Sequence, residues 1–146
     1  MVDAAGRPGH ATSLAVAYLD LDGFKSINDN AGHAAGDVVL ATAAARLRSV
    51  IRDHDLVARV GGDEFVVIAT GITESELRSL SERILERLNT PVRLPSSQLA
   101  TVGASIGVHY VNLDDGFAIE VVESSIAAAD AAMLQAKRAG KNRVFC

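Results

Sequence analysis

The chain has 146 residues, of which 49% are hydrophobic, so it is long and apolar enough for one domain with a hydrophobic core. Its net charge of −4 and lack of basic tracts argue against a nucleic-acid-binding protein, and no apolar run approaches the ~18 residues of a membrane span. The only cysteine, Cys146, is the last residue, so no internal disulfide can form, which fits a cytoplasmic location.

Helical and strand-like patterns alternate irregularly along the chain. In chain order, the expected elements are a flexible lead over 1–13, a buried strand over 14–20, a short helix over 24–31, a longer helix from 36, a hairpin over 56–69, a helix from 74 that stops before 91, a long strand over 99–110, a helix over 119–139 and a short strand over 143–145. This order, with its tight hairpin, predicts an α+β fold with a mainly antiparallel sheet rather than a doubly wound parallel sheet.

Two local signals in this pattern are specific. Gly61-Gly62 is expected to supply the positive φ of a tight primed hairpin turn. Thr73 and Glu76 form a capping box, which predicts the start of the helix that follows.

Two acidic clusters follow strand-like apolar runs. Asp20-Leu21-Asp22 ends the first expected strand, and Asp63-Glu64 follows the paired glycines of the hairpin. A carboxylate at the end of a buried strand is unfavourable unless it is paired or bound to metal, and Mg²⁺ typically takes one or two carboxylates plus substrate phosphates. The pattern therefore predicts a metal-assisted phosphoryl-transfer site, and the alternative is a solvated turn with surface carboxylates. An EF-hand does not fit, because Gly23 falls at the fourth loop position instead of the sixth.

Five ordered blocks of sequence carry a resemblance to the GGDEF domain of diguanylate cyclases. They are Asp20–Asp29, Gly32–Asp37, Arg59–Phe65, Ala104–Val108 and Ala136–Val144. The resemblance implies a five-stranded sheet flanked by helices, similar to the palm of adenylyl cyclases and polymerases, over 14–146. It also implies condensation of two GTP into cyclic di-GMP and two pyrophosphates by a transient homodimer, with Mg²⁺ or Mn²⁺ as cofactor.

The resemblance further assigns roles to the acidic residues and to one lysine. Asp20, Asp63 and the backbone carbonyl of Leu21 would bind the metal. Asp63 would also act as the base for the ribose hydroxyl, with Glu64 as an acidic neighbour. Lys25 would stabilise the charge of the transition state.

Other matching positions would bind the substrate. These are Phe24 in the strand-to-helix turn that receives phosphate, Asn28 and Asp37 as readers of guanine, His33 as a further contact, and Lys137 and Lys141 for the terminal phosphates. The alternatives are helix caps for Asn28 and Asp37, a loop histidine, and lysines that only complement a helix dipole. Lys141 stands where arginine is more usual, so bidentate geometry would be lost.

Arg52 and Asp55 match an Arg-x-x-Asp motif that forms a product-binding inhibitory site in many family members. Arg83 is a candidate for a second arginine at that site. The alternative is an ordinary surface ion pair between Arg52 and Asp55.

One departure bears on activity. Residues 1–13 lack the Asp-x-Leu-Thr-Gly segment that usually opens the family's domains, so the domain is expected to lack the family's N-terminal helix. Two alternatives to an active cyclase follow: a catalytically silent module that binds GTP or cyclic di-GMP, and a purely structural dimerisation fragment. Formation of cyclic di-GMP from GTP distinguishes an active cyclase from the silent module and the structural fragment.

Overall fold

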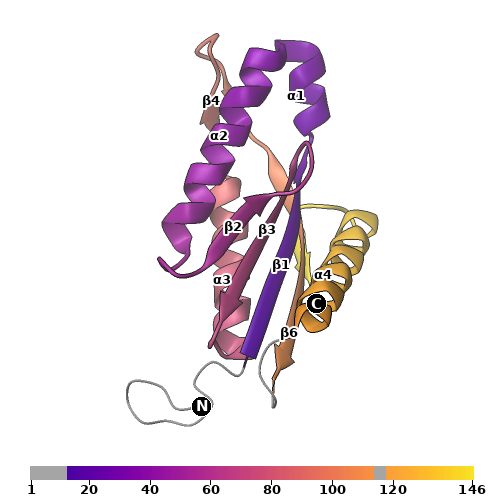
Figure 1. The fold of residues 1–146 in the computed structure, drawn as a ribbon. Coiled ribbons are helices and arrows are strands. Elements are labelled where there is room, and N and C mark those ends of the chain that lie inside the picture. The colour runs from indigo at the N-terminus through magenta and orange to yellow at the C-terminus, as the bar shows by residue number, and fades with distance from the viewer. Residues whose placement is uncertain (1–12, 114–117) are drawn as a thin grey trace.

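The computed structural model describes residues 13–113 and 118–146. Its elements, shown in Figure 1, are β1 (Ser13–Asp22), α1 (Phe24–Ala31), α2 (His33–Val50), β2 (Leu56–Arg59), β3 (Glu64–Thr70), α3 (Glu74–Leu88), β4 (Val92–Arg93), β5 (Leu99–Ala100), β6 (Gly103–Asn112), α4 (Ile119–Arg138) and β7 (Arg143–Phe145). The lead predicted over 1–13 lies outside the described residues except for Ser13, which begins β1.

Five strands form the main sheet in the order β2-β3-β1-β6-β7, with β1 at its centre. The β2–β3, β1–β3 and β1–β6 pairs are antiparallel, whereas β6 and β7 are parallel. The predicted α+β fold with a mainly antiparallel five-stranded sheet is therefore confirmed, and the sheet is mixed in detail.

Helices cover both faces of this sheet (Figure 1). On one face, the side chains of Ala17 and Leu19 in β1 belong to a core shared with Leu47 of α2 and Ile84 of α3. On the other face, Val16 packs in a smaller cluster with α4 residues. The alternation of β1 side chains between two apolar layers explains why its sequence is apolar at nearly every position.

A glycine in β6 sets the distance of α4 from the sheet. A Cβ at Gly107 would collide with the α4 backbone at the carbonyl of Ala129 and the amide of Met133. Gly107 lies opposite Tyr18 on β1. The missing side chain therefore lets α4 lie directly against the centre of the sheet.

Three local predictions need correction. The longer helix begins at His33, one turn before the predicted position 36. The single strand expected over 99–110 is two strands: β5 pairs with β4 in a separate small sheet, and β6 joins the main sheet. Val102, between them, is 2% exposed, so the chain bends to bury this side chain in the core and leaves the extended path.

The third correction concerns the hairpin turn. Neither Gly61 nor Gly62 has a positive φ, because the loop spans four residues and Val60 N–H donates to Glu64 O (2.9 Å) across it. The space beside Gly61 is occupied by the Glu64 side chain, because a Cβ at 61 would lie 2.8 Å from its Oε1 and the glutamate would have to shift.

The capping box of α3 is confirmed. Thr73 Oγ1 accepts from the Glu76 amide (3.0 Å), and Glu76 Oε1 accepts from the Thr73 amide (2.8 Å). The helix ends at Leu88, before Pro91, as predicted. Within the described parts of the chain, no helix is both long enough and apolar enough to cross a membrane.

Candidate active site at the end of the central strand

The two acidic clusters meet at one edge of the sheet. The antiparallel register sets Asp20 of β1 opposite Glu64 of β3. The amide of Leu21 donates to the carbonyl of Asp63 (3.0 Å), which fastens the hairpin loop to the end of β1. Burial, followed by the charge and hydrogen bonding of Asp20, raises the pKa of Asp63 to about 6. Two carboxylates are therefore crowded together at this point.

A pocket of about 310 Å³ opens at these carboxylates. We call it the acidic pocket, and it is lined by Asp20, Leu21, Asp22, Gly23, Phe24, Lys25, Asp63, Lys137 and Lys141. The end of β1, the hairpin loop and the end of α4 thus contribute predicted site residues to one cavity.

The acidic pocket contains a cation from α4. Lys137 Nζ forms an ion pair with Asp20 Oδ2. Burial lowers the pKa of Lys137, but its hydrogen bond to Asp20 and the charges of Asp20 and Asp63 outweigh that effect and raise it. Lys137 is therefore protonated and partly offsets the negative charge of the pocket.

Asp22 anchors a loop instead of pointing freely into the pocket. Its carboxylate accepts from Ser105 Oγ (2.7 Å) and from the Asn142 amide (2.8 Å). Lys141 and Asn142 both have positive φ, at 65° and 49°, which is uncommon outside glycine. Asp22 therefore holds the loop that carries Lys141 to the pocket, a role that the Asp-x-Asp pattern alone does not disclose.

The donor set at this site fits a divalent cation that is held mostly by a substrate. Among residues 13–113 and 118–146, no group of three or more His, Cys, Asp or Glu side chains could hold a metal ion. The carboxylates of Asp20 and Asp63 and the carbonyl of Leu21 offer oxygen ligands, and Mg²⁺ commonly uses one or two carboxylates plus substrate phosphates. Burial and the nearby Asp20 raise the pKa of Asp63, and a bound cation would favour the charged form of this carboxylate.

Asn28 in α1, one turn after Phe24 of the acidic pocket, has an unused acceptor. Its Oδ1 atom is buried and has no hydrogen-bond partner among the described residues. A Cβ at Gly36 would overlap this amide and lie 3.3 Å from Cζ of Phe24, so Asn28 fits only because residue 36 is glycine. Buried polar atoms without partners are rare, which makes Asn28 a candidate ligand contact.

The helix-cap alternatives do not hold. Asn28 lies inside α1, and Asp37 lies more than a turn inside α2, whose N-cap is Gly32. Asp37 does not line the acidic pocket. Instead, Asp37 lines a groove of about 350 Å³ between α2 and β2. His33 is the exposed first residue of α2 and lines neither cavity.

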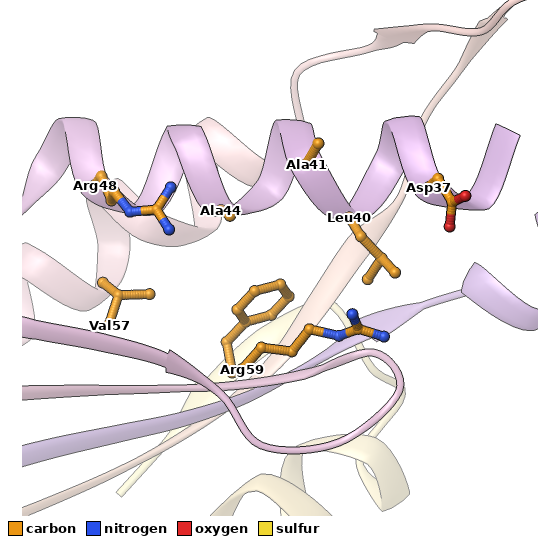
Figure 2. A pocket seen from close by; sticks show the side chains of 8 residues that line it. Asp37, Leu40, Ala41, Ala44, Arg48, Val57 and Arg59 are labelled. Atoms are coloured by element: carbon orange, nitrogen blue, oxygen red, sulfur yellow. The ribbon is translucent and has the colours of Figure 1, made fainter. Parts of the chain in front are cut away.

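Figure 2 shows this groove, with the Arg59 guanidinium extending below Leu40 and Asp37 at one end. Arg59 Nε donates to the carbonyls of Gly61 and Gly62, both at 3.1 Å. Arg59 therefore ties down the hairpin loop that carries the acidic residues.

Glu64 does not line the acidic pocket. Its Oε1 accepts from the hydroxyl of Tyr18 (2.9 Å) on the α4 face of the sheet. Burial, together with this bond and the charge of Glu64, raises the pKa of Tyr18 to about 12. Sequence reasoning missed Tyr18 because an aromatic residue inside an apolar run is typical of a strand core.

Lys25 lines the acidic pocket, but its side chain is 90% exposed and its Nζ lies 4.0 Å from Oδ2 of Asp29.

Arg52 and Asp55 form a second polar site at the other end of the hairpin. Arg52 Nη2 donates to Asp55 Oδ1 (2.7 Å) and to the Thr70 carbonyl (2.7 Å). Burial opposes ionisation of Asp55, but hydrogen bonds from the Arg52 side chain and amide outweigh it and lower the Asp55 pKa. Arg83 of α3 lines the same cavity of about 390 Å³ as this pair. The pair is thus more than an isolated surface contact, since it is tied to β3 and faces a second arginine.

A mainly antiparallel five-stranded sheet with helices on both faces and an acidic pocket at the end of β1 is the arrangement of a cyclase palm-like domain. The family model described as "Diguanylate cyclase, GGDEF domain" matches residues 3–143. The chain therefore belongs to the GGDEF domain family of diguanylate cyclases.

Similar proteins support this assignment. Diguanylate cyclase A of Treponema denticola is 36% identical over 132 residues, which are 90% of this chain and 34% of that protein. Cyclic di-GMP phosphodiesterase NbdA of Pseudomonas aeruginosa is 43% identical over 88% of this chain and 16% of that protein. The solved GGDEF domain of DgcB from Caulobacter crescentus, in complex with c-di-GMP, superposes with a TM-score of 0.81 at 29% identity, covering 92% of this chain and 77% of that one. The chain thus spans only about a third or less of these two curated relatives.

Proposed function

We propose that this domain is an active diguanylate cyclase that condenses two GTP into cyclic di-GMP with release of two pyrophosphates. The observation that carries the proposal is the acidic pocket, where Asp20 and Asp63 face each other beside Lys137 and Lys141. Such a pocket suits a triphosphate accompanied by Mg²⁺ or Mn²⁺. The proposal also places the domain in the cytoplasm, where GTP is available.

In each bond-forming step, the 3′-oxygen of one GTP forms a bond to the α-phosphorus of the other. The bond from that phosphorus to the pyrophosphate oxygen breaks, and the hydroxyl proton passes to Asp63. When bound, the metal would offset phosphate charge and lower the barrier to attack. Asp20, Asp63 and the Leu21 carbonyl would hold it, while Lys25 would stabilise developing negative charge.

The remaining residues would hold and select the nucleotide. Lys137 would exchange its ion pair with Asp20 for the terminal phosphates, and Lys141 would approach them from the strained loop. Asn28, with its unused acceptor, and Asp37 would read the guanine edge, with His33 as a further contact. Phe24 would contribute to the strand-to-helix turn that receives phosphate.

Ring closure requires two such half-sites to face each other, so we propose a transient homodimer as the active form. Each subunit would present one GTP, and each 3′-hydroxyl would attack the nucleotide of the other subunit. Catalysis would then depend largely on positioning two bound substrates.

We also propose that product binds at Arg52 and Asp55 and inhibits the enzyme. Arg83, in the same cavity, would supply a second guanidinium for phosphate or for the Hoogsteen edge of guanine. The DgcB domain in complex with c-di-GMP supports cyclic di-GMP as a ligand of this domain type.

One observation favours a second candidate, a silent module that binds GTP or cyclic di-GMP. The relative NbdA is named as a cyclic di-GMP phosphodiesterase, so a segment like this one also occurs in a protein that is not named as a cyclase. Incubation with GTP and Mg²⁺, followed by chromatography, separates the two: cyclic di-GMP supports the cyclase. If no product forms, GTP binding in calorimetry would identify a silent module, and no binding would leave a structural fragment.

A further inference from the structure

The hydroxyl of Tyr18 donates a hydrogen bond to the Glu64 carboxylate, and both side chains lie on the α4 face of the sheet. Tyr18 lies two residues before Asp20, which is the partner of Glu64 in the register, so the side chains of Tyr18 and Glu64 are diagonal neighbours on one face of β1 and β3. The bond from Tyr18 Oη to Glu64 Oε1 is 2.9 Å and partly buried. Bonds to a carboxylate are stronger than those between neutral groups.

The Glu64 side chain also lies beside the hairpin loop. A Cβ built at Gly61 would lie 2.8 Å from Glu64 Oε1 and 3.3 Å from Glu64 Cβ, so this side chain occupies the space that the missing side chain of Gly61 leaves open. The Tyr18 hydroxyl is the side-chain group that holds the carboxylate there.

Two consecutive acidic residues of the hairpin therefore differ in position. Asp63 lines the acidic pocket, whereas Glu64 does not, although both lie near Lys137 and their charges raise its pKa. Without the bond from Tyr18, the Glu64 carboxylate would be free to turn toward Lys137. It would then compete with Asp20 for that cation.

We propose that Tyr18 is a positioning residue for catalysis, whose hydroxyl holds the Glu64 carboxylate on the α4 side of the hairpin. This inference rests on the proposed cyclase function. Tyr18 does not line the acidic pocket, so it acts through Glu64 and not by contact with the nucleotide.

The test compares two tyrosine variants of the full chain in GTP with Mg²⁺, at a protein concentration where the specific activity of the wild type no longer rises. Tyr18→Phe should lower kcat about tenfold and leave the KM for GTP within about twofold, because the lost contact orients a group outside the binding pocket. Tyr110→Phe is the matched control, since its hydroxyl donates to the Ile72 carbonyl (2.8 Å) far from Glu64. The control should leave kcat and KM unchanged, and urea unfolding of both variants shows whether stability explains any difference.

A double-mutant cycle on kcat distinguishes a positioning role of Tyr18 from a purely structural one. Tyr18→Phe should lower kcat in the wild-type background but have no further effect in a Glu64→Ala background. Full kcat in Tyr18→Phe, a change confined to KM, or losses that multiply in the double variant would each overturn the inference. Failure of the proposed cyclase function would be seen separately, because the wild-type chain would then form no cyclic di-GMP. That result would also overturn the positioning role of Tyr18.

Discussion

At the residue scale, the site is built from side chains whose partners come from distant parts of the chain. Asp20 is paired with Lys137, which follows it by 117 positions, and Asp22 holds the loop that carries Lys141. The one group left without a partner is the Oδ1 of Asn28, among the described buried side-chain atoms. Lys137, which would meet phosphate, is therefore paired before substrate binds, whereas Asn28, which would meet the base, has an unsatisfied acceptor.

The unpaired Oδ1 of Asn28 leads to a prediction about which nucleotide base the domain binds. If Asn28 and Asp37 read guanine, GTP should bind more tightly than ATP, since adenine lacks the N1–H and 2-amino donors. Each unpaired buried contact should weaken binding by roughly 1–3 kcal/mol. Calorimetry with Mg²⁺ and each nucleotide measures this, and Asn28→Ala should narrow the difference. Equal affinities for GTP and ATP in the wild type would rule out these two residues as readers.

Variants of Arg52 and Arg83, when compared, test inhibition by the product more sharply than a variant of either residue alone. Arg83→Ala should weaken cyclic di-GMP binding and raise the final product yield with little effect on the initial rate, since Arg83 lies away from the acidic pocket. Arg52→Ala should abolish product binding at this site but also lose the bonds to Asp55 and Thr70. Calorimetry with cyclic di-GMP, with and without GTP, measures binding. Product binding that both variants retain would contradict the inhibitory site.

At the element scale, the Arg52–Asp55 pair joins the segment after α2 to the end of β3, because Arg52 also donates to the Thr70 carbonyl. The pair therefore contributes to stability whether or not it binds product. Its side chains differ in exposure, with Asp55 only 3% exposed and Arg52 41% exposed. Burial opposes the charged form of Asp55, but the hydrogen bonds that this carboxylate accepts favour it more strongly.

The lowered pKa of Asp55 predicts a defined pH dependence of stability. A carboxyl group whose pKa is lower in the folded state stabilises the fold above its unfolded pKa, near 4, and loses this contribution as the pH falls through the folded value. The free energy of unfolding in urea should therefore be larger at pH 7 than at pH 3. Asp55→Asn should lower the value at pH 7 and reduce the difference between the two pH values. A variant with the same pH difference as wild type would contradict this role.

Elements with local signals were predictable, and those set by distant contacts were not. The capping box at Thr73 and the apolar run of β1 are readable from neighbouring residues alone. The break between β5 and β6 depends on burial of Val102 by the rest of the core, which no local pattern encodes. Likewise, the roles of Tyr18 and Asp22 depend on the register of β1 with its neighbours, so the sequence indicated the acidic clusters but not how each member is used.

At the scale of the whole molecule, one sheet carries two sites at opposite ends of the same hairpin. The acidic pocket lies at the β3 end that begins with Glu64, and the Arg52 site lies beside the end of β3 at Thr70. The hairpin therefore links the proposed catalytic and inhibitory sites through a rigid element. Product held between two domains at the second site would keep their acidic pockets apart without blocking either one.

The requirement for two half-sites gives a prediction about concentration. Specific activity should rise with protein concentration and level off once the dimer is saturated, because ring closure needs two loaded subunits. We expect the isolated chain to be mainly monomeric and slow at low concentration. Initial rates over a wide dilution series, with light scattering on the same samples, measure this. A specific activity that stays constant on dilution, in samples that scatter as monomers, would argue against the transient homodimer.

Cyclase activity is tested most directly by incubating the wild-type chain and Asp63→Ala with GTP and Mg²⁺ and separating the products by chromatography. Wild type should form cyclic di-GMP and pyrophosphate. Asp63→Ala should lose at least about a hundredfold in rate, because it removes the proposed base and a metal ligand. The variant should keep its fold, since Asp63 lies in the hairpin loop and not in the core, and circular dichroism and urea unfolding check this. A folded Asp63→Ala variant with wild-type yield, or a wild-type chain that binds GTP but forms no product, would contradict the account.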